Sequence, residues 1–202
     1  MHGAEYERMP PPSFETVGAT YSGETGANYD RERRGAKWNA EVNALEELFR
    51  HVPQGARTLY APVGTARFFG LFDAHKLQVH GIDMSQDMLT QAQAAAGAVG
   101  GALALQQADL RQIPYPDDFF DLVVCIRFLN LVDRESASIV LRELTRVSGD
   151  KLLIGIRYIA PAGELSGMAG LVRHALRPIW VLRRLYRRSA VLIQTKAFVT
   201  DA

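Results

Sequence analysis

The sequence predicts a doubly wound α/β fold, in which a mainly parallel sheet carries helices on both faces. Apolar strand-like segments alternate with segments of helical periodicity up to residue 159, and this alternation is typical of parallel sheets. Residues 119–128 are strongly apolar and β-branched, as expected of a central strand that is buried on both faces. Ser85 precedes a helical segment with Asp87 in its first turn, a combination that marks a helix N-terminus.

The alternating segments can be assigned in order along the chain. Strands are expected at residues 56–61, 77–83, 102–109, 119–128 and 151–159. Helices are expected at residues 35–51, 65–75, 85–98 and 134–148, where apolar side chains recur at helical spacing.

The two ends of the chain depart from this pattern. Residues 1–28 contain three consecutive prolines and lack apolar periodicity, so we expect a mobile N-terminal arm or lid. Residues 29–159 form the predicted binding domain. Residues 160–202 are expected to complete the same domain as a basic helical segment, with a helix over 171–190 that kinks or restarts at Pro178.

Composition indicates a globular protein with one domain. The chain has 202 residues, of which 48% are hydrophobic and 22% charged, enough to bury a core. Its single cysteine excludes an internal disulfide framework, and no His or Cys cluster has the spacing of a metal site. The first 30 residues lack a secretion signal, and no apolar run is long enough to span a bilayer. We therefore expect a cytoplasmic protein without a metal.

The net charge of +1 conceals an uneven distribution of charge. Residues 1–150 carry a net charge of −6 and residues 151–202 carry +7. Much of the positive charge comes from arginines interleaved with apolar residues: Arg173, Arg177, Arg183, Arg184, Arg187 and Arg188. Two interpretations stay open, an amphipathic helix that covers the sheet and a contact with an anionic surface. The second would place the protein at the periphery of a membrane.

The residues that follow the predicted strands suit a nucleoside-like ligand. Gly64 follows the first strand, Asp83 ends the second, and Asp109 ends the third. Ligands of α/β sheets bind outside the carboxyl ends of the strands. There Asp83 can accept hydrogen bonds from both hydroxyl groups of a ribose, and Asp109 can accept a hydrogen bond from an exocyclic adenine amine. The turn around Gly64 can present backbone N–H groups to an anionic group.

The order of these segments resembles a known enzyme family. The pieces are "TLYAPVGTARF", "VHGIDMSQDML", "LQQADLRQIPYPDDFFDLVVCIRFLNLV" and "LRELTRVSGDKLLI". Together they resemble the class I S-adenosylmethionine-dependent methyltransferases, closest to the small-molecule type that includes ubiquinone-biosynthesis enzymes. The resemblance spans about residues 29–159 and implies a Rossmann-like domain that binds S-adenosylmethionine.

The resemblance also implies roles for individual residues. The turn of residues 61–67, with Ala61, Pro62, Val63 and Gly64, would hold the methionine part of the cofactor. Asp83 and Met84 would contact the ribose and the adenine, and Asp109 and Leu110 the adenine. Ile126, Arg127 and Phe128 would line the transfer site, and an N-terminal lid would contribute Tyr21, Tyr29 and Trp38. No general base can be named, so Arg127, Phe128 and Tyr21 are candidates for the substrate site only.

The chain departs from the family pattern in two places. The family turn is commonly D-x-G-x-G-x-G, and here Tyr60, Pro62, Gly64 and Ala66 occupy its four defined positions. Gly64 retains the position that most needs a positive φ. The family also continues into two further strands, and the residues after 159 are few for both. We therefore expect a sheet that is incomplete at its C-terminal edge, truncated or completed by a partner.

The resemblance implies an enzyme that moves the methyl group of S-adenosylmethionine to a small or lipid-like acceptor. Nucleic acid is not expected as the partner, and a homodimer stays open. One alternative is a catalytically degenerate protein that binds S-adenosylmethionine or S-adenosylhomocysteine without turnover. A nicotinamide-nucleotide enzyme is disfavoured, because the dinucleotide turn needs several glycines.

Overall fold

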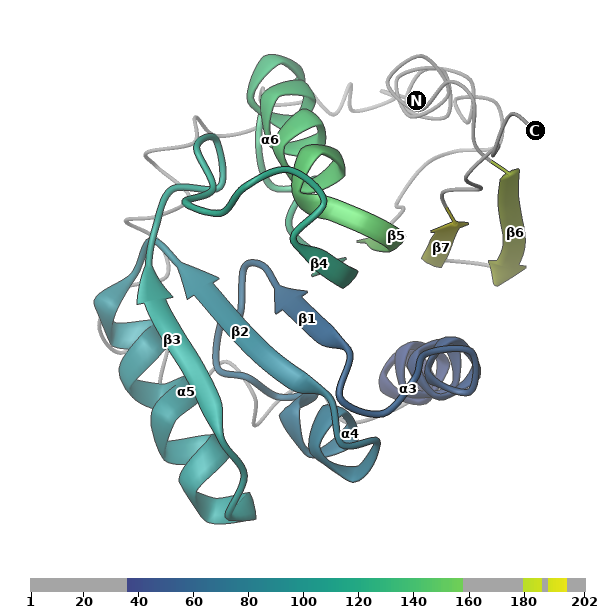
Figure 1. Ribbon diagram of the computed structural model, residues 1–202. Coiled ribbons are helices and arrows are strands. Elements are labelled where there is room, and N and C mark those ends of the chain that lie inside the picture. The colour runs from purple at the N-terminus through teal and green to yellow at the C-terminus, as the bar shows by residue number, and fades with distance from the viewer. Residues whose placement is uncertain (1–35, 158–179, 187–188, 196–202) are drawn as a thin grey trace, which may run out of the picture.

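The computed structural model describes residues 36–157, 180–186 and 189–195. The helices are α3 (Ala36–Phe49), α4 (Phe69–Ala74), α5 (Gln86–Val99) and α6 (Arg134–Val147). The strands are β1 (Arg57–Tyr60), β2 (Gln78–Asp83), β3 (Leu103–Gln107), β4 (Phe120–Ile126), β5 (Ser148–Arg157), β6 (Trp180–Tyr186) and β7 (Ser189–Thr195). They form one seven-stranded sheet in the order β3-β2-β1-β4-β5-β7-β6 (Figure 1).

The first five strands run parallel, as the sequence predicted. β1 pairs with β2 on one side and with β4 on the other, and both pairings are parallel. The strand order therefore reverses at β1, which is the arrangement of a doubly wound sheet. The predicted fold class is confirmed.

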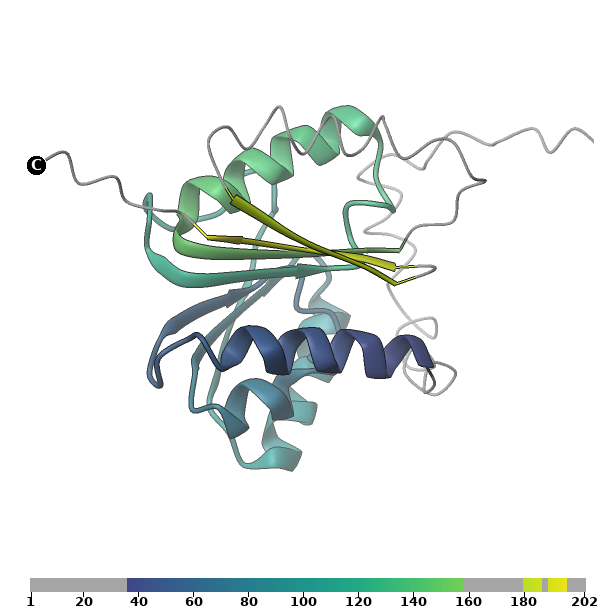
Figure 2. The ribbon, with the colours of Figure 1, turned by 90° about the vertical axis from the view of Figure 1, so that its right-hand side faces the viewer.

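Helices cover both faces of the sheet. Figure 2 shows α6 on one side and α3, α4 and α5 on the other. The side chains of β4 alternate between two buried clusters, with Val123 and Cys125 facing α6 and Leu122 and Val124 facing the other helices. β4 is thus the central strand that its apolar sequence predicted.

Cys125 is part of the core on the α6 face. The side chain is fully buried, and burial raises the pKa of its thiol to about 12. The thiol therefore stays protonated at neutral pH and serves as a small apolar residue.

Local signals place the ends of α5. The Ser85 hydroxyl accepts a hydrogen bond from the Met88 N–H at 3.3 Å, so the predicted N-cap is confirmed. The helix ends at Val99 and is capped by Gly100, which has a left-handed φ of 75°. None of the helices in the described part of the chain has the length and apolar character needed to cross a membrane.

The C-terminal segment differs from its prediction. The prediction of a helix over residues 171–190 is wrong for the described residues 180–186 and 189–190. These residues belong to the strands β6 and β7. β7 pairs antiparallel with β5, and β6 pairs antiparallel with β7. This pairing satisfies backbone groups of β5 that would otherwise form an open edge. The edge expected to be incomplete is therefore extended by two strands, and residues 1–28 and 160–179 lie outside the described ranges.

Gly81 of β2 packs closely against Val63 in the turn after β1 and Leu105 in β3, which leaves no room for a side chain. A Cβ on Gly81 would lie 2.8 Å from Leu105 Cδ2 and 2.8 Å from Val63 Cγ2. We expect Gly81→Ala to lower the free energy of unfolding by about 1–3 kcal/mol in urea denaturation. Gly97→Ala is the control, because a Cβ there meets no atom within 4 Å and a helical alanine gains up to about 1 kcal/mol. Equal effects of the two substitutions would contradict the packing argument.

Candidate functional site

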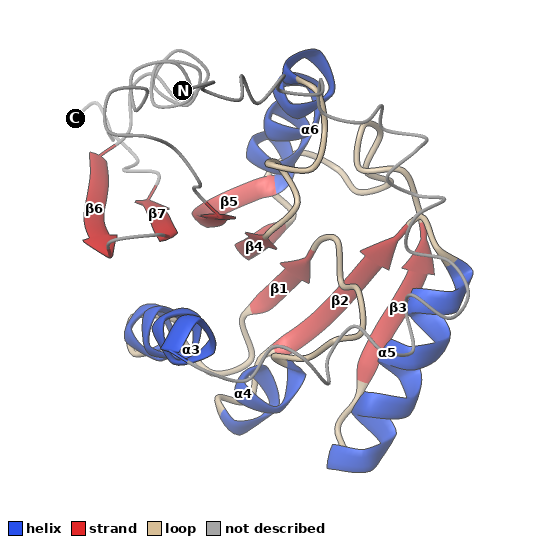
Figure 3. Ribbon diagram, turned by 180° about the vertical axis from the view of Figure 1, so that it is seen from behind, coloured by secondary structure: helices blue, strands red, loops and turns tan. Residues whose placement is uncertain are grey.

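The carboxyl ends of three parallel strands meet at one edge of the sheet. Tyr60, the last residue of β1, is paired with Gly81 of β2 and with Val124 of β4. Figure 3 shows β1 lying between its two neighbours. The residues that follow these strands therefore start side by side, at the switch point where open α/β sheets bind ligands.

The segment between β1 and α4 is tied to both neighbouring strands. The Ala61 N–H donates to the Val124 carbonyl at 3.0 Å, and the Val63 N–H donates to the Ile82 carbonyl at 2.8 Å. The peptide bond between Ala61 and Pro62 is cis. The turn is therefore fixed on both sides without the family's full set of glycines.

Two residues of this turn have left-handed backbone conformations. Gly64 has a φ of 53° and Ala66 a φ of 54°, and only the first was expected from the sequence. An α-helix cannot contain such residues, so the helix predicted from residue 65 begins only at Phe69. A Cβ built on Gly64 would meet no atom within 4 Å, so open space lies against the turn at this residue.

Asp83 connects the turn to the start of α5. Its Oδ2 accepts a hydrogen bond from the Gly64 N–H at 3.0 Å, and its Oδ1 accepts one from the Ser85 N–H at 2.9 Å. The residue is 9% exposed. Burial raises the pKa of this carboxyl group above its usual value, and the N–H groups of Ser85, Gly64 and Met84 oppose the shift. The structure thus brings together Gly64 and Asp83, two of the predicted cofactor residues.

Asp109 is engaged by a neighbouring side chain. The Arg111 guanidinium donates to both carboxylate oxygens, with Nη2 at 2.9 Å from Oδ2 and Nε at 3.2 Å from Oδ1. The Asp109 side chain is one-third exposed and lines a hollow of about 660 Å³. Leu110 beside it is buried in the core. Asp109 therefore faces open space, and Arg111 occupies part of its acceptor capacity.

Arg127, directly after β4, is buried and bound to a residue far away in the sequence. Its Nε donates to Glu41 Oε1 at 2.5 Å, and Arg67 Nη2 donates to Glu41 Oε2 at 2.9 Å. All three side chains are at most 9% exposed. Arg127 also has a φ of 59°, which costs about 1–2 kcal/mol in a residue with a Cβ.

Glu41 was not predicted from the sequence. It lies on α3, and its neighbours at i+4, i+7 and i+8 are Leu45, Leu48 and Phe49, all buried in the core. An acidic residue on the apolar face of a helix is rarely buried without a partner, and this was the signal available in the sequence. The structure shows that its partners are Arg67 and Arg127.

The remaining residues predicted for the site are partly core residues and partly outside the described part of the chain. Ile126 and Phe128 are buried on either side of Arg127, and Met84 packs partly buried against the core. Trp38 belongs to α3, but its side chain lies outside the described part, as do Tyr21 and Tyr29. Their predicted contacts with a cofactor remain predictions.

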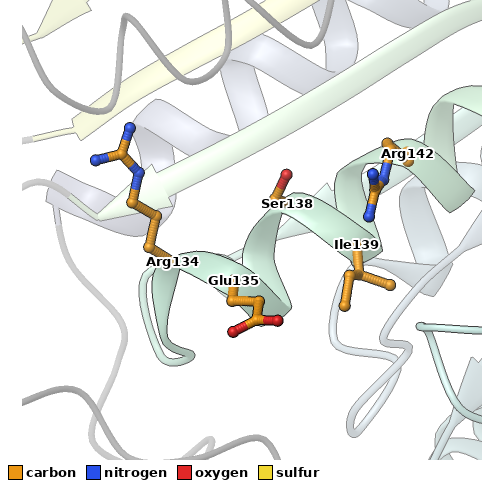
Figure 4. Close-up of a pocket in the computed structure, with 5 residues that line it drawn as sticks. All are labelled: Arg134, Glu135, Ser138, Ile139 and Arg142. Atoms are coloured by element: carbon orange, nitrogen blue, oxygen red, sulfur yellow. The ribbon is translucent and has the colours of Figure 1, made fainter.

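A second hollow, of about 420 Å³, lies along α6. Its lining comes from a single helix: Arg134, Glu135, Ser138, Ile139 and Arg142 (Figure 4). Figure 4 shows the two arginines at opposite ends of this row. Groups that do not converge make a poor binding site, so the sheet edge is the better candidate.

Part of the chain matches a known family model, and part matches a known protein. Residues 59–151 match the family model described as a methyltransferase domain. Over 119 residues the chain is 30% identical to the phosphatidylethanolamine N-methyltransferase of Cereibacter sphaeroides. The match covers 57% of this chain and 57% of that enzyme, so the chain spans little more than half the length of its curated relative.

Solved structures share the fold. The magnesium protoporphyrin IX methyltransferase of Synechocystis PCC 6803 with bound SAM superposes with a TM-score of 0.70 at 16% identity, covering 91% of this chain and 96% of that chain. The 1,6-didemethyltoxoflavin-N1-methyltransferase of Burkholderia thailandensis gives a TM-score of 0.69 at 15% identity, and the match covers 97% of this chain and 98% of that chain. Because the sequence identities are only 15–16%, these structural similarities establish the fold alone. It is the fold that the sequence resemblance implied.

The left-handed conformation of Ala66 predicts an unusual response to substitution. Ala66→Gly removes the backbone strain and one buried methyl group, so we expect the free energy of unfolding to stay level or to rise by up to about 1 kcal/mol. Ala92→Gly, at a buried position of α5, should instead lower it by about 1–2 kcal/mol. Urea denaturation measures both, and equal losses would show that Ala66 is not strained.

Proposed function

We propose that this chain, whose residues 59–151 match the methyltransferase domain family model, transfers the methyl group of S-adenosylmethionine to an acceptor by in-line displacement. The observation that carries this proposal is the hydrogen bond between Gly64 and Asp83 at the switch point. It joins a turn with backbone N–H groups to a buried carboxylate. Both parts lie inside the segment that matches the family.

The residues at this edge fit the cofactor. The open space against Gly64 accommodates the methionine part beside the turn. The Asp83 carboxylate accepts N–H groups from Gly64, Ser85 and Met84, and a carboxylate has about four acceptor sites. About one acceptor site of Asp83 therefore remains for a ribose hydroxyl group.

When bound, S-adenosylmethionine supplies a methyl group that its sulfonium has already activated. The residues of the chain then have to align the acceptor and exclude water. Ile126 and Phe128 are buried apolar residues at the transfer end and serve the second task. Asp109 binds the adenine amine through the acceptor capacity that Arg111 leaves.

The acceptor that we propose is a small or lipid-like molecule. Support comes from the Cereibacter sphaeroides relative, which is named for a phospholipid substrate. Contact with an anionic membrane surface remains a prediction, now with Arg183 and Arg184 in strand β6 and not in a helix. A homodimer likewise remains a prediction.

A protein that binds the cofactor without turnover is the other candidate. The glycine-poor turn motivates it. The family match and the relative, both named for methyltransferases, do not favour it.

Calorimetric titration tests the cofactor site. We expect the wild-type chain to bind S-adenosylhomocysteine, and Asp83→Ala to weaken binding by about 1.5–3 kcal/mol, as for lost hydrogen bonds to a charged group. Asp121→Ala is the matched control, because Asp121 also accepts a backbone N–H, from Arg57, at the start of β1 and so at the opposite edge. An unchanged affinity in the Asp83 variant would remove this residue from the site.

Methyl transfer is tested separately, with S-adenosylmethionine and a panel of amine, hydroxyl and phospholipid acceptors. We expect transfer to at least one acceptor and its loss in Asp83→Ala at low cofactor concentration. Cofactor binding without transfer to any acceptor would favour the binding protein. Stronger thermal stabilisation by NAD than by S-adenosylhomocysteine would contradict both candidates.

A further inference from the structure

We infer that Arg127 binds an anionic oxygen, from a carboxylate or a phosphate group, of a molecule held at the carboxyl edge of the sheet. This inference rests on the proposed function, because that function places a substrate at this edge. The Arg127 side chain is only 8% exposed. Its Nη1 is a buried N–H donor that has no hydrogen-bond partner within the described part of the chain.

A buried donor without an acceptor destabilises the folded protein. Most buried polar groups are paired, and an unpaired one is a sign of a missing partner such as a ligand. Arginine cannot lose its charge to relieve the cost. The missing partner of Arg127 is therefore an acceptor, and a negatively charged acceptor fits a guanidinium group best.

The only carboxylate that Arg127 binds in the described part of the chain is shared. Glu41 divides its single negative charge between Arg127 and Arg67. Glu41 does not need Arg127 for charge balance, because Arg67 already pairs with it at 2.9 Å. The fold therefore does not need a second buried guanidinium group to neutralise Glu41.

The backbone of Arg127 points to the same conclusion. The left-handed φ of 59° is strain that persists only where the surroundings enforce it, and such residues cluster at binding sites. The residue is the first after the central strand β4, and Glu41 links it to Arg67 at the end of the cofactor turn. Strain, burial and an unpaired donor thus coincide in one residue of the proposed site.

Two molecules at this edge can supply the anionic oxygen. One is the carboxylate of the methionine part of the cofactor, and the other is an acidic group of the acceptor. S-adenosylhomocysteine carries the carboxylate, and 5′-methylthioadenosine has the same nucleoside thioether without it. Inorganic phosphate represents the acidic group of an acceptor.

The experiment compares the wild-type chain with Arg127→Met, with Arg127→Lys, and with the control Arg50→Met. The Arg50 side chain is exposed, and the residue follows directly after α3. Affinities for S-adenosylhomocysteine and 5′-methylthioadenosine are measured by calorimetry. Binding of phosphate is measured as the shift in thermal unfolding, against chloride at equal ionic strength. Urea denaturation measures the stability of each variant.

If the cofactor supplies the oxygen, Arg127→Met weakens S-adenosylhomocysteine about tenfold or more and leaves 5′-methylthioadenosine unchanged. If the acceptor supplies it, both nucleosides bind as before, and the shift caused by phosphate is lost in Arg127→Met. In either case Arg127→Met is at least as stable as the wild type, because the pair of Glu41 and Arg67 remains. Arg127→Lys retains the charge and recovers part of the binding.

Unchanged binding of all three probes in Arg127→Met would overturn the inference. So would a loss of stability in Arg127→Met that Arg127→Lys restores without any effect on the probes, because Arg127 would then be structural. A wild-type chain that binds neither nucleoside contradicts the proposed function. The phosphate measurement still decides the role of Arg127 in that case.

Discussion

The Asp83 carboxylate is the group on which the arrangement of the site depends. Its two oxygens accept N–H groups from Gly64 in the turn and from Ser85 at the cap of α5. The carboxylate lies at the end of β2, so this one side chain fixes three segments relative to one another. A buried acid that only backbone N–H groups solvate destabilises the fold, as the upward shift of its pKa indicates. Residues kept at such a cost are typical of binding sites.

The turn after β1 is ordered although it has only one of the three glycines in the common pattern. Pro62 stands at the first glycine position, and the N–H groups of Ala61 and Val63 on either side of it bond to β4 and β2. Ala66 adopts the left-handed conformation that a glycine would take without strain. Only Gly64, which faces open space, retains the family residue. The turn is therefore held by hydrogen bonds to the neighbouring strands at positions where the common pattern has glycine.

Much of the fold could be predicted because local signals agreed with the global arrangement. The apolar run of β4 and the capping residue Ser85 each identify an element without knowledge of the rest. The strands at residues 180–195 could not be predicted in this way, because their arginine-rich sequence also fits a helix. Pairing of β7 with the distant β5, and of β6 with β7, decides their conformation.

The site could be predicted only in part, for the same reason. Asp83 and Asp109 follow strands, so topology alone placed them at the correct edge. Glu41 lies before the first strand, and only the packing of α3 brings it to Arg67 and Arg127. The bidentate bond from Arg111 to Asp109 is likewise a choice of side-chain conformation that residue spacing does not specify.

The sharing of Glu41 also couples the two ends of the site. Arg67 and Arg127 bind different oxygens of one carboxylate, so an anion that neutralises Arg127 would leave Glu41 to attract Arg67 more strongly. Arg67 ends the turn of residues 61–67, and this turn would then be held more firmly whenever an anion is bound at Arg127. By thermodynamic reciprocity, a ligand that orders the turn would raise the affinity for the anion to the same degree. Cooperativity between two ligands can thus arise from one glutamate, without any movement of the sheet.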